Sequence, residues 1–256
     1  MFGIEKQLYN QLCNLRDNYS LDGIKAEFEA EGSSLEDLIR LRRITIKADV
    51  KLYLKIGGVE ALRDIKDAMR IGVDGVIAPM VESVFAAKKF HDTLLKTYDK
   101  FFVDSTLNIE TRDSIDQLEN ILEFASERFN NITIGRSDLS SSYFDREIKP
   151  DSDFIFQVIE NIAPKIVEKG LKMNLGGSLS SNTIQLINDK FPTLKSFLNN
   201  LETRKVIMPS SVYFEKEDAI KEALKFEELW ILSKKEFLNL EMGNDIARLT
   251  QLMNRI

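Results

Sequence analysis

The sequence contains very few of the residues that build disulfides and transition-metal centres. Its 256 residues include one cysteine, Cys13, and one histidine, His91. A single cysteine excludes an internal disulfide and a thiolate metal site, and we expect Cys13 to be a packed thiol in an amphipathic helix. A single histidine excludes multi-histidine metal sites, and we expect His91 on the flank of a helix over 81–98. Carboxylates would therefore have to hold any bound metal, which points to a hard cation such as Mg²⁺ or Mn²⁺.

Excess positive charge and long apolar runs are missing as well. The 35 basic residues are outnumbered by 41 acidic ones, the net charge is -6, and no basic stripe stands out along the chain. This charge distribution argues against a nucleic acid partner. No run of 18 apolar residues occurs, and residues 1–20 lack the uninterrupted apolar core of a signal peptide. We therefore expect no membrane partner and a cytoplasmic location.

Short β-rich runs alternate with longer helical patterns along the chain. The predicted strands span 23–32, 51–58, 74–80, 100–111, 131–138, 171–178 and 204–211. The predicted helices between them span 34–48, 58–72, 81–98, 112–129, 151–170 and 180–200. Several of these helices open with Ser or Asp, and three close on or just before Gly, as helices commonly do. Strict β–α alternation of this kind is typical of a parallel sheet covered by helices.

The fold class that fits this pattern is a single (β/α)₈ TIM barrel over residues 1–256. No Pro- or Gly-rich linker divides the chain, and no G-x-G-x-x-G follows the first strand, which disfavours an open dinucleotide-binding sheet. A length of about 250 residues is typical of one barrel. The eighth strand is not evident. It could be a weak strand within 1–22, or the barrel could depart from the standard count.

The C-terminal segment 216–256 predicts two or three amphipathic helices that extend the barrel. It is richer in large apolar residues than a helix closing a barrel needs, notably Leu229, Trp230, Leu232, Phe237 and Leu240. Two interpretations remain open for them. They could pack under the barrel, or some could meet another subunit, and we expect a homo-oligomer.

Polar residues follow most of the predicted strands, at the end of a barrel where active sites lie. In the strand over 100–111, alternation puts Asp104, Thr106, Asn108 and Glu110 on one face. Asp138 ends the next strand, so two carboxylates reach the same rim and could share one hard cation. From spacing alone, Asp138 could equally cap the following helix, and Glu110 could be an exposed rim residue. Gly and Ser at 176–178 and 209–211 suit either anion binding or turns.

Three motifs carry a resemblance to a known family. The segments "GVDGVIAPMVES", "LNIETRDSIDQLENIL" and "ITIGRSDLSSS", in this order and spacing, resemble the HpcH/HpaI aldolase and citrate lyase β-subunit family of phosphoenolpyruvate/pyruvate-binding barrels. The resemblance implies that Glu110 and Asp138 bind Mg²⁺ or a similar ion that holds a pyruvate-like fragment. It also implies that the backbone from Gly135 to Asp138 receives the substrate carboxylate. The candidate substrate-binding residues are Pro79, Gly135, Arg136 and Ser137, although Arg136 could instead pair with a neighbouring acid.

Two departures from the family pattern affect the proposed chemistry. Lys55 stands where hydroxy-acid aldolases of the family typically carry an Arg that steadies the enolate oxygen, and a lysine lacks the bidentate fork. The histidine that commonly tunes a metal-bound water is missing as well. Glu27 and Glu29 become the candidates for proton transfer. Alternatively, these glutamates form salt bridges with Lys25 and Lys55 around the barrel mouth.

Three functions follow from these residues. The first is a divalent-metal-dependent carbon–carbon lyase or aldolase that acts on a pyruvate-like 2-oxo acid through a metal-stabilised enolate. The second is a citrate-lyase-like or malyl-CoA-lyase-like enzyme acting on an acyl thioester, against which the lack of a visible basic patch counts mildly. The third is a barrel that has lost turnover and serves as a binding or assembly protein.

Overall fold

A closed barrel of eight strands, in chain order, forms the centre of the computed structural model, which describes residues 3–99 and 103–255. The strands are β1 (Gly23–Glu27), β2 (Leu52–Lys55), β3 (Gly75–Ala78), β4 (Asp104–Ile109), β5 (Asn131–Gly135), β6 (Lys172–Gly176), β7 (Leu198–Glu202) and β8 (Val206–Pro209). The expected TIM-type barrel is thereby confirmed. Residues 100–102 of the predicted fourth strand lie outside the described residues.

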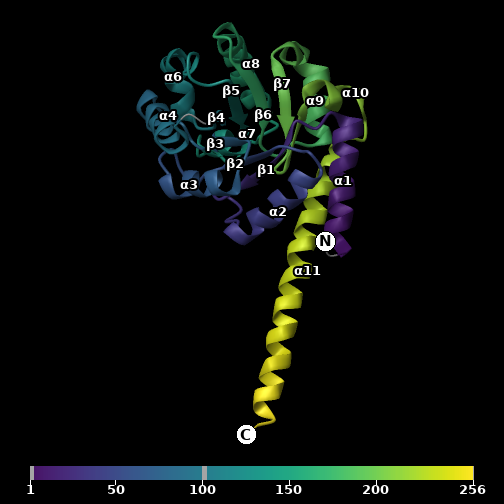
Figure 1. Cartoon of the computed structure of the whole chain (residues 1–256). Coiled ribbons are helices and arrows are strands. Elements are labelled where there is room, and N and C mark those ends of the chain that lie inside the picture. Colours follow the sequence, from purple (N-terminus) through teal and green to yellow (C-terminus); the bar gives the residue numbers. More distant parts are fainter. Residues whose placement is uncertain (1–2, 100–102, 256) are drawn as a thin grey trace.

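Helices surround the barrel, as Figure 1 shows. They are α1 (Gly3–Tyr19), α2 (Leu35–Lys47), α3 (Leu62–Ile71), α4 (Val84–Tyr98), α5 (Arg112–Asp116), α6 (Leu118–Ala125), α7 (Arg136–Ser141), α8 (Asp153–Glu168), α9 (Ser181–Lys190), the 3₁₀ helix η1 (Pro192–Ser196), α10 (Ser210–Glu215) and α11 (Ala219–Met253). Ser34, Ser83 and Ser152 cap α2, α4 and α8 by accepting backbone N–H bonds, as their positions predicted. No helix in the described part of the chain has an apolar stretch long enough to cross a bilayer.

The strand that the sequence analysis did not predict is β7. Residues 1–22 hold no strand where the structure describes them; they form α1 and the approach to β1. The predicted helix over 180–200 was wrong beyond residue 190, because α9 ends there, Pro192 starts a 3₁₀ turn, and β7 begins at Leu198.

β8 runs in the opposite direction to the other strands, pairing antiparallel with both β7 and β1. A short hairpin joins β7 to β8, and the Thr203 hydroxyl accepts bonds from the N–H groups of Lys205 and Val206 there. Because β8 is reversed, Pro209 and Ser210 lie at the end of the barrel opposite the other strand ends. Pro209 pairs with Asn200 in the middle of β7, and Ser210 begins α10. The segment 209–211 therefore cannot contribute to a site at the carboxyl rim.

One long helix, α11, replaces the two or three helices expected in the tail. Its first half packs along α1, and Leu229 and Trp230 are buried there. Leu232 and Leu240 are exposed. Figure 1 shows the second half of α11 extending away from the barrel.

The inside of the barrel is unusually polar. Its buried apolar side chains form one small cluster of Tyr53, Ile77 and Ile207, separate from the large core between the strands and the outer helices. Barrel interiors are more often filled by layers of Val, Ile and Leu. The predicted polar face of β4 is confirmed, because its alternate residues line the two cavities at the barrel ends while Leu107 and Ile109 are buried in the outer core.

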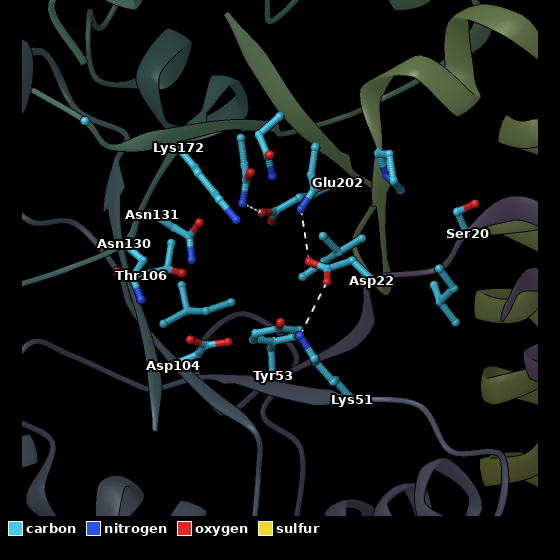
Figure 2. A pocket seen from close by; sticks show the side chains of 18 residues that line it. Ser20, Asp22, Lys51, Tyr53, Asp104, Thr106, Asn130, Asn131, Lys172 and Glu202 are labelled. Carbon is cyan, nitrogen blue, oxygen red and sulfur yellow. Dashed lines mark hydrogen bonds and ion pairs between the residues drawn. The ribbon is translucent and has the colours of Figure 1, made fainter. Parts of the chain in front are cut away.

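The cavity at the amino ends of the strands has a volume of about 520 Å³. Figure 2 shows Lys172, Asp104 and Tyr53 around this hollow from three sides. At the edge of the cavity, Lys51 Nζ lies 3.7 Å from Asp22 Oδ1. Catalytic residues of TIM-type barrels come from the opposite end, so we treat this hollow as part of the barrel floor.

Two glycines enclose the ring of Tyr53 in this floor. A Cβ added at Gly23 or at Gly75 would collide with opposite edges of the ring, so the ring cannot shift away from one glycine without approaching the other. We expect Gly75→Ala to lower the free energy of unfolding by about 1–3 kcal/mol through overpacking. Urea unfolding followed by the fluorescence of the buried Trp230 measures the change. Gly58→Ala is the matched control, because no atom lies within 4 Å of its added Cβ, and an equal loss in both variants would contradict the explanation.

Candidate active site

A cavity of about 350 Å³ opens at the carboxyl ends of the parallel strands. It is polar, and its walls come from the ends of β1, β2, β4, β5, β6 and β7 together with the start of α7 and the first part of α11. The predicted site residues that line it are Glu27, Glu29, Lys55, Glu110, Gly135, Ser137 and Asp138. The fold therefore gathers in one hollow residues that are spread over more than a hundred positions of the chain.

Glu110 follows β4 and is only 1% exposed, which excludes its interpretation as an exposed rim residue. Its Oε1 accepts a bond from Met80 N (2.9 Å), and its Oε2 accepts one from Asn108 Nδ2 (3.0 Å). Burial raises the pKa of the Glu110 carboxyl, the ammonium of Lys55 opposes that rise, and the charge of Asp138 adds to it. Glu110 is thus a rigidly held carboxylate whose negative charge is costly without a further cation.

Glycine at position 135 is what allows Glu110 to sit at this depth. Gly135 ends β5 beside β4, and a Cβ there would collide with the carboxylate of Glu110. Gly177, after β6, serves a similar purpose: it has a left-handed φ of 85°, and a Cβ there would lie 2.5 Å from Ser137 N. The approach of these segments to one another therefore requires the two glycines.

Asp138 lies in the first turn of α7, and the position that caps this helix is Gly135. No side-chain cap bond is made at that end of α7, so the capping interpretation of Asp138 is wrong. Asp138 lines the cavity instead, close enough to Glu110 for their charges to interact. Within the described residues, no group of three or more His, Cys, Asp or Glu side chains is arranged to hold a metal. Any cation here would take its remaining ligands from other oxygens.

Lys55 ends β2 as a buried cation between two acids. Its Nζ lies 2.9 Å from Glu29 Oε2 and 3.4 Å from Glu110 Oε1. Burial favours the neutral amine, but the carboxylates of Glu110 and Glu29 outweigh it and raise the pKa of Lys55 above its ordinary value. Lys55 is therefore held in its positively charged form by the carboxylates of Glu110 and Glu29.

The glutamates of the first strand also form the salt bridges that we weighed as an alternative. Glu27 ends β1, is 5% exposed, and lies 3.7 Å from Lys25 Nζ. Glu29 follows the strand and pairs with Lys55. Both carboxylates still line the cavity, so pairing and proton transfer remain compatible.

Arg136 and Pro79 do not line the cavity. Arg136 is fully buried, forms an ion pair with Asp151, and donates to Gly176 O (3.2 Å) and Gly177 O (2.6 Å). Of its two open interpretations, pairing with a neighbouring acid is the one observed. Arg136 therefore fastens the start of α7 to the loop after β6, and Pro79 contributes only by preceding Met80.

Sequence reasoning did not identify Glu202 or Met80, and it placed Asn108 on the polar face of its strand without assigning it a role. Glu202, on the unpredicted β7, accepts bonds from Lys25 (3.2 Å), Thr133 (3.0 Å) and Asn174 (3.2 Å) in the middle of the barrel. Asn108 orients Glu110, and its own Oδ1 is buried with no hydrogen-bond partner. Met80 holds Glu110 through its backbone, which has a left-handed φ of 47°. The polar face of β4 was the only available signal, and it pointed to Asn108 alone.

Several solved structures share this fold at low sequence identity. No protein-family model and no curated protein sequence matches the chain. An HpcH/HpaI aldolase from Desulfitobacterium hafniense DCB-2 is 13% identical, with a TM-score of 0.59 over 76% of this chain and 82% of that one. A citrate lyase from Burkholderia xenovorans LB400 is 11% identical, with a TM-score of 0.61 over 90% of this chain and 79% of that one.

A citrate synthase, SbnG, is 16% identical, with a TM-score of 0.55 over 72% of this chain and 78% of its own. These three solved structures are thus an aldolase, a citrate lyase and a citrate synthase. The resemblance drawn from the three sequence motifs is confirmed in the fold of the chain.

The raised pKa of Glu110 predicts a gain in stability when its charge is removed. A carboxyl whose pKa is raised by folding stabilises the protein below its unfolded pKa and loses that contribution as pH rises through its folded pKa. We therefore expect Glu110→Gln, without added metal, to raise the melting temperature at pH 7 and to raise it less at pH 4. Differential scanning calorimetry at the two pH values measures this. Glu119→Gln, which removes an exposed partner of Lys165, serves as the control and should give no gain; a gain of equal size at both pH values for Glu110→Gln would contradict the assignment.

Proposed function

We propose that this protein is a divalent-metal-dependent carbon–carbon lyase or aldolase that acts on a pyruvate-like 2-oxo acid. The observation that carries the proposal is the meeting of Glu110, Asp138 and the cation of Lys55 in one polar cavity at the carboxyl ends of the strands. The fold shared with aldolases and citrate lyases supports it. Two carboxylates beside a fixed cation suit the stabilisation of an enolate, whose negative charge develops during carbon–carbon bond cleavage.

The donor set fits a hard cation. Glu110 and Asp138 would hold it, and the partnerless Oδ1 of Asn108 on the same face of β4 is a further oxygen in the cavity wall. Oxygen donors suit Mg²⁺ and Mn²⁺, and the absence of nearby histidine and cysteine disfavours softer metals. When bound, such a cation would supply the positive charge that orients the 2-oxo acid and stabilises its enolate.

Lys55 and the two glutamates would divide the remaining work. Lys55, held protonated 3.4 Å from Glu110, would steady the enolate oxygen as a point charge. Glu27 ends the first strand and Glu29 follows it, and both line the cavity. One of these two carboxylates would move the proton at the reacting carbon. Glu29 is the more accessible of the two, with 20% of its side chain exposed against 7% for Glu27.

The substrate carboxylate would be received between α7 and the loop after β6. The first N–H groups of a helix have no partner within the helix, and Ser137 and Asp138 belong to the first turn of α7. The hydroxyls of Ser137 and Ser178 lie 2.9 Å apart in the same wall. Gly135 and Gly177 allow the segments that form this wall to approach one another closely.

Removing the two carboxylates tests the metal site. We expect Glu110→Gln and Asp138→Asn each to weaken Mn²⁺ binding by at least about tenfold in titration calorimetry, because each removes an anionic ligand. The exchange of pyruvate methyl protons for deuterium, followed by NMR with Mg²⁺ or Mn²⁺, should fall in parallel. Asp116→Asn, at an exposed position outside the cavity, is the control. Unchanged metal binding in both variants would overturn the proposal, and an absence of exchange in the wild-type protein would favour a binding or assembly role.

Replacing Lys55 separates its charge from metal binding. We expect Lys55→Met to lower the rate of methyl-proton exchange by about 10²–10³-fold, the loss typical of one group that stabilises an oxyanion. Lys55→Arg should retain more of the rate, because it keeps the charge. Steady-state exchange rates at saturating metal make the comparison. Equal rates for the two variants would mean that the charge of Lys55 is not used.

An acyl thioester substrate is the second candidate, and one observation favours it. A second cavity, lined by Arg146 and Lys149, adjoins the cavity at the carboxyl ends of the strands and shares Ser137 and Ser178 with it. The sequence showed no basic patch near a strand end, but the fold brings these two cations beside one, where they could meet the phosphates of a coenzyme A thioester. Arg146→Ala with Lys149→Ala should then weaken acetyl-CoA binding about tenfold and leave pyruvate exchange unchanged. Failure of the wild-type protein to bind acetyl-CoA would remove this candidate.

A further inference from the structure

The cavity at the amino ends of the strands contains two charged side chains that are not paired. Asp104 begins β4 and Lys172 begins β6, and Figure 2 shows both side chains pointing into the hollow. Neither side chain forms a hydrogen bond or an ion pair with the part of the chain that the structure describes. The other charged groups of the lining, Asp22, Lys51 and Glu202, each have an ion-pair partner. The cavity therefore offers a ligand one negative and one positive charge.

One strand, β5, lies between these two charges. Asn131 of β5 pairs with Thr106 of β4 on one side and with Lys172 of β6 on the other, so Lys172 starts two strand spacings, about 10 Å, from β4. Figure 2 shows Asn130 and Asn131 on the wall between Lys172 and Asp104. The gap between the charges suits a small ligand with opposite charges at its two ends.

The ring of Tyr53 forms a flat surface beside Asp104. Gly23 and Gly75 lie at opposite edges of the ring, so the ring lies across β1, β2 and β3 with one face toward the inside of the barrel. A Cβ on Gly75 would lie 3.2 Å from the Cβ of Asp104, which makes Asp104 a direct neighbour of the ring. An ammonium group is attracted both by the face of an aromatic ring and by a carboxylate. This corner of the cavity therefore suits the positive end of a ligand.

A buried acceptor further along β6 also lacks a partner. Asn174 lines the cavity and is 5% exposed. Its Nδ2 donates to Glu202 Oε1 (3.2 Å), but its Oδ1 has no hydrogen-bond partner within the described residues. A buried acceptor left unsatisfied is costly, so a ligand that donates a hydrogen bond to this oxygen would recover that cost.

We propose that this cavity binds a free α-amino acid with a polar, uncharged side chain. The ammonium group of the amino acid would lie between the face of Tyr53 and the carboxylate of Asp104. Its carboxylate would meet the ammonium of Lys172, and its side chain would donate to Asn174 Oδ1. These residues lie outside the candidate catalytic set, so the inference does not rest on the proposed function.

Serine and two of its analogues test the class of ligand. Glycerate carries a hydroxyl in place of the ammonium group, and ethanolamine lacks the carboxylate. We expect L-serine to bind the full-length protein with a dissociation constant below about 1 mM in titration calorimetry, and each analogue to bind at least about tenfold more weakly. Failure of L-serine, L-asparagine and L-glutamine to bind would overturn the proposal, as would equal binding of serine and its analogues.

Two substitutions test which residue meets each end of the ligand. Asp104→Asn should weaken serine binding at least about tenfold and leave glycerate binding within about threefold of the wild-type value. Lys172→Gln should weaken serine binding by a similar factor and leave ethanolamine binding within the same limit. Neither substitution removes a side-chain contact within the described part of the protein, and the fluorescence of Trp230 checks that the variants are folded.

Two control variants locate the site. Asp116→Asn removes an exposed charge outside the cavity and should leave serine binding unchanged. Glu110→Gln, in the cavity at the carboxyl ends, should leave it unchanged as well. Loss of serine binding in Glu110→Gln together with retention in Asp104→Asn and Lys172→Gln would place the amino acid at the carboxyl ends and contradict the proposal. Loss of metal binding or of proton exchange, by contrast, would bear only on the proposed enzymatic function.

Discussion

Buried charges inside the barrel have to be neutralised by one another, and this requirement determines the arrangement of the site. Lys55 is paired with Glu29 and Glu110, and Lys25 is paired with Glu27 and Glu202. A lysine left here without any carboxylate would be an uncompensated charge in a poorly solvated place, which is costly. The rotamers of the cavity are therefore set by electrostatics, and the apolar core outside the strands holds the backbone that presents them.

The reversal of β8 adds another buried ion pair at the carboxyl rim of the barrel. Because β7 and β8 form a hairpin at the carboxyl rim, Lys205 pairs there with Glu31 beside the ring of Trp230, and both charged side chains are almost fully buried. In a barrel of eight parallel strands, this part of the rim would be another loop leading to a helix. Here it is a tight turn fixed by the Thr203 hydroxyl, so the candidate active site is bounded by a rigid edge at that side.

The strand ends were predictable because alternation and polar punctuation are local. The polar face of β4 and the meeting of Glu110 with Asp138 at one rim follow from the side-chain period of a strand and from parallel pairing. β7 was not predictable, because the apolar spacing over 180–200 is also helical and Pro192 interrupts it. With β7 unrecognised, the antiparallel direction of β8 could not be inferred, although a three-residue link excludes a parallel crossover. The burial of Arg136 depends on Asp151 and Gly177, which are brought to it only by the fold.

Glu202 has a further consequence, because it borders both hollows of the barrel. Glu202 lines the cavity at the carboxyl ends and the cavity at the amino ends, and its hydrogen-bond partner Asn174 lines the cavity at the amino ends. Glu202 and the side chains that donate hydrogen bonds to it therefore lie between the two cavities. Reactions that must keep bulk water away from a carbanion have to shut it out from below as well as from above. In this barrel the side chains between the two cavities are polar, so the exclusion of water from the amino ends of the strands depends on their hydrogen bonds and not on hydrophobic packing.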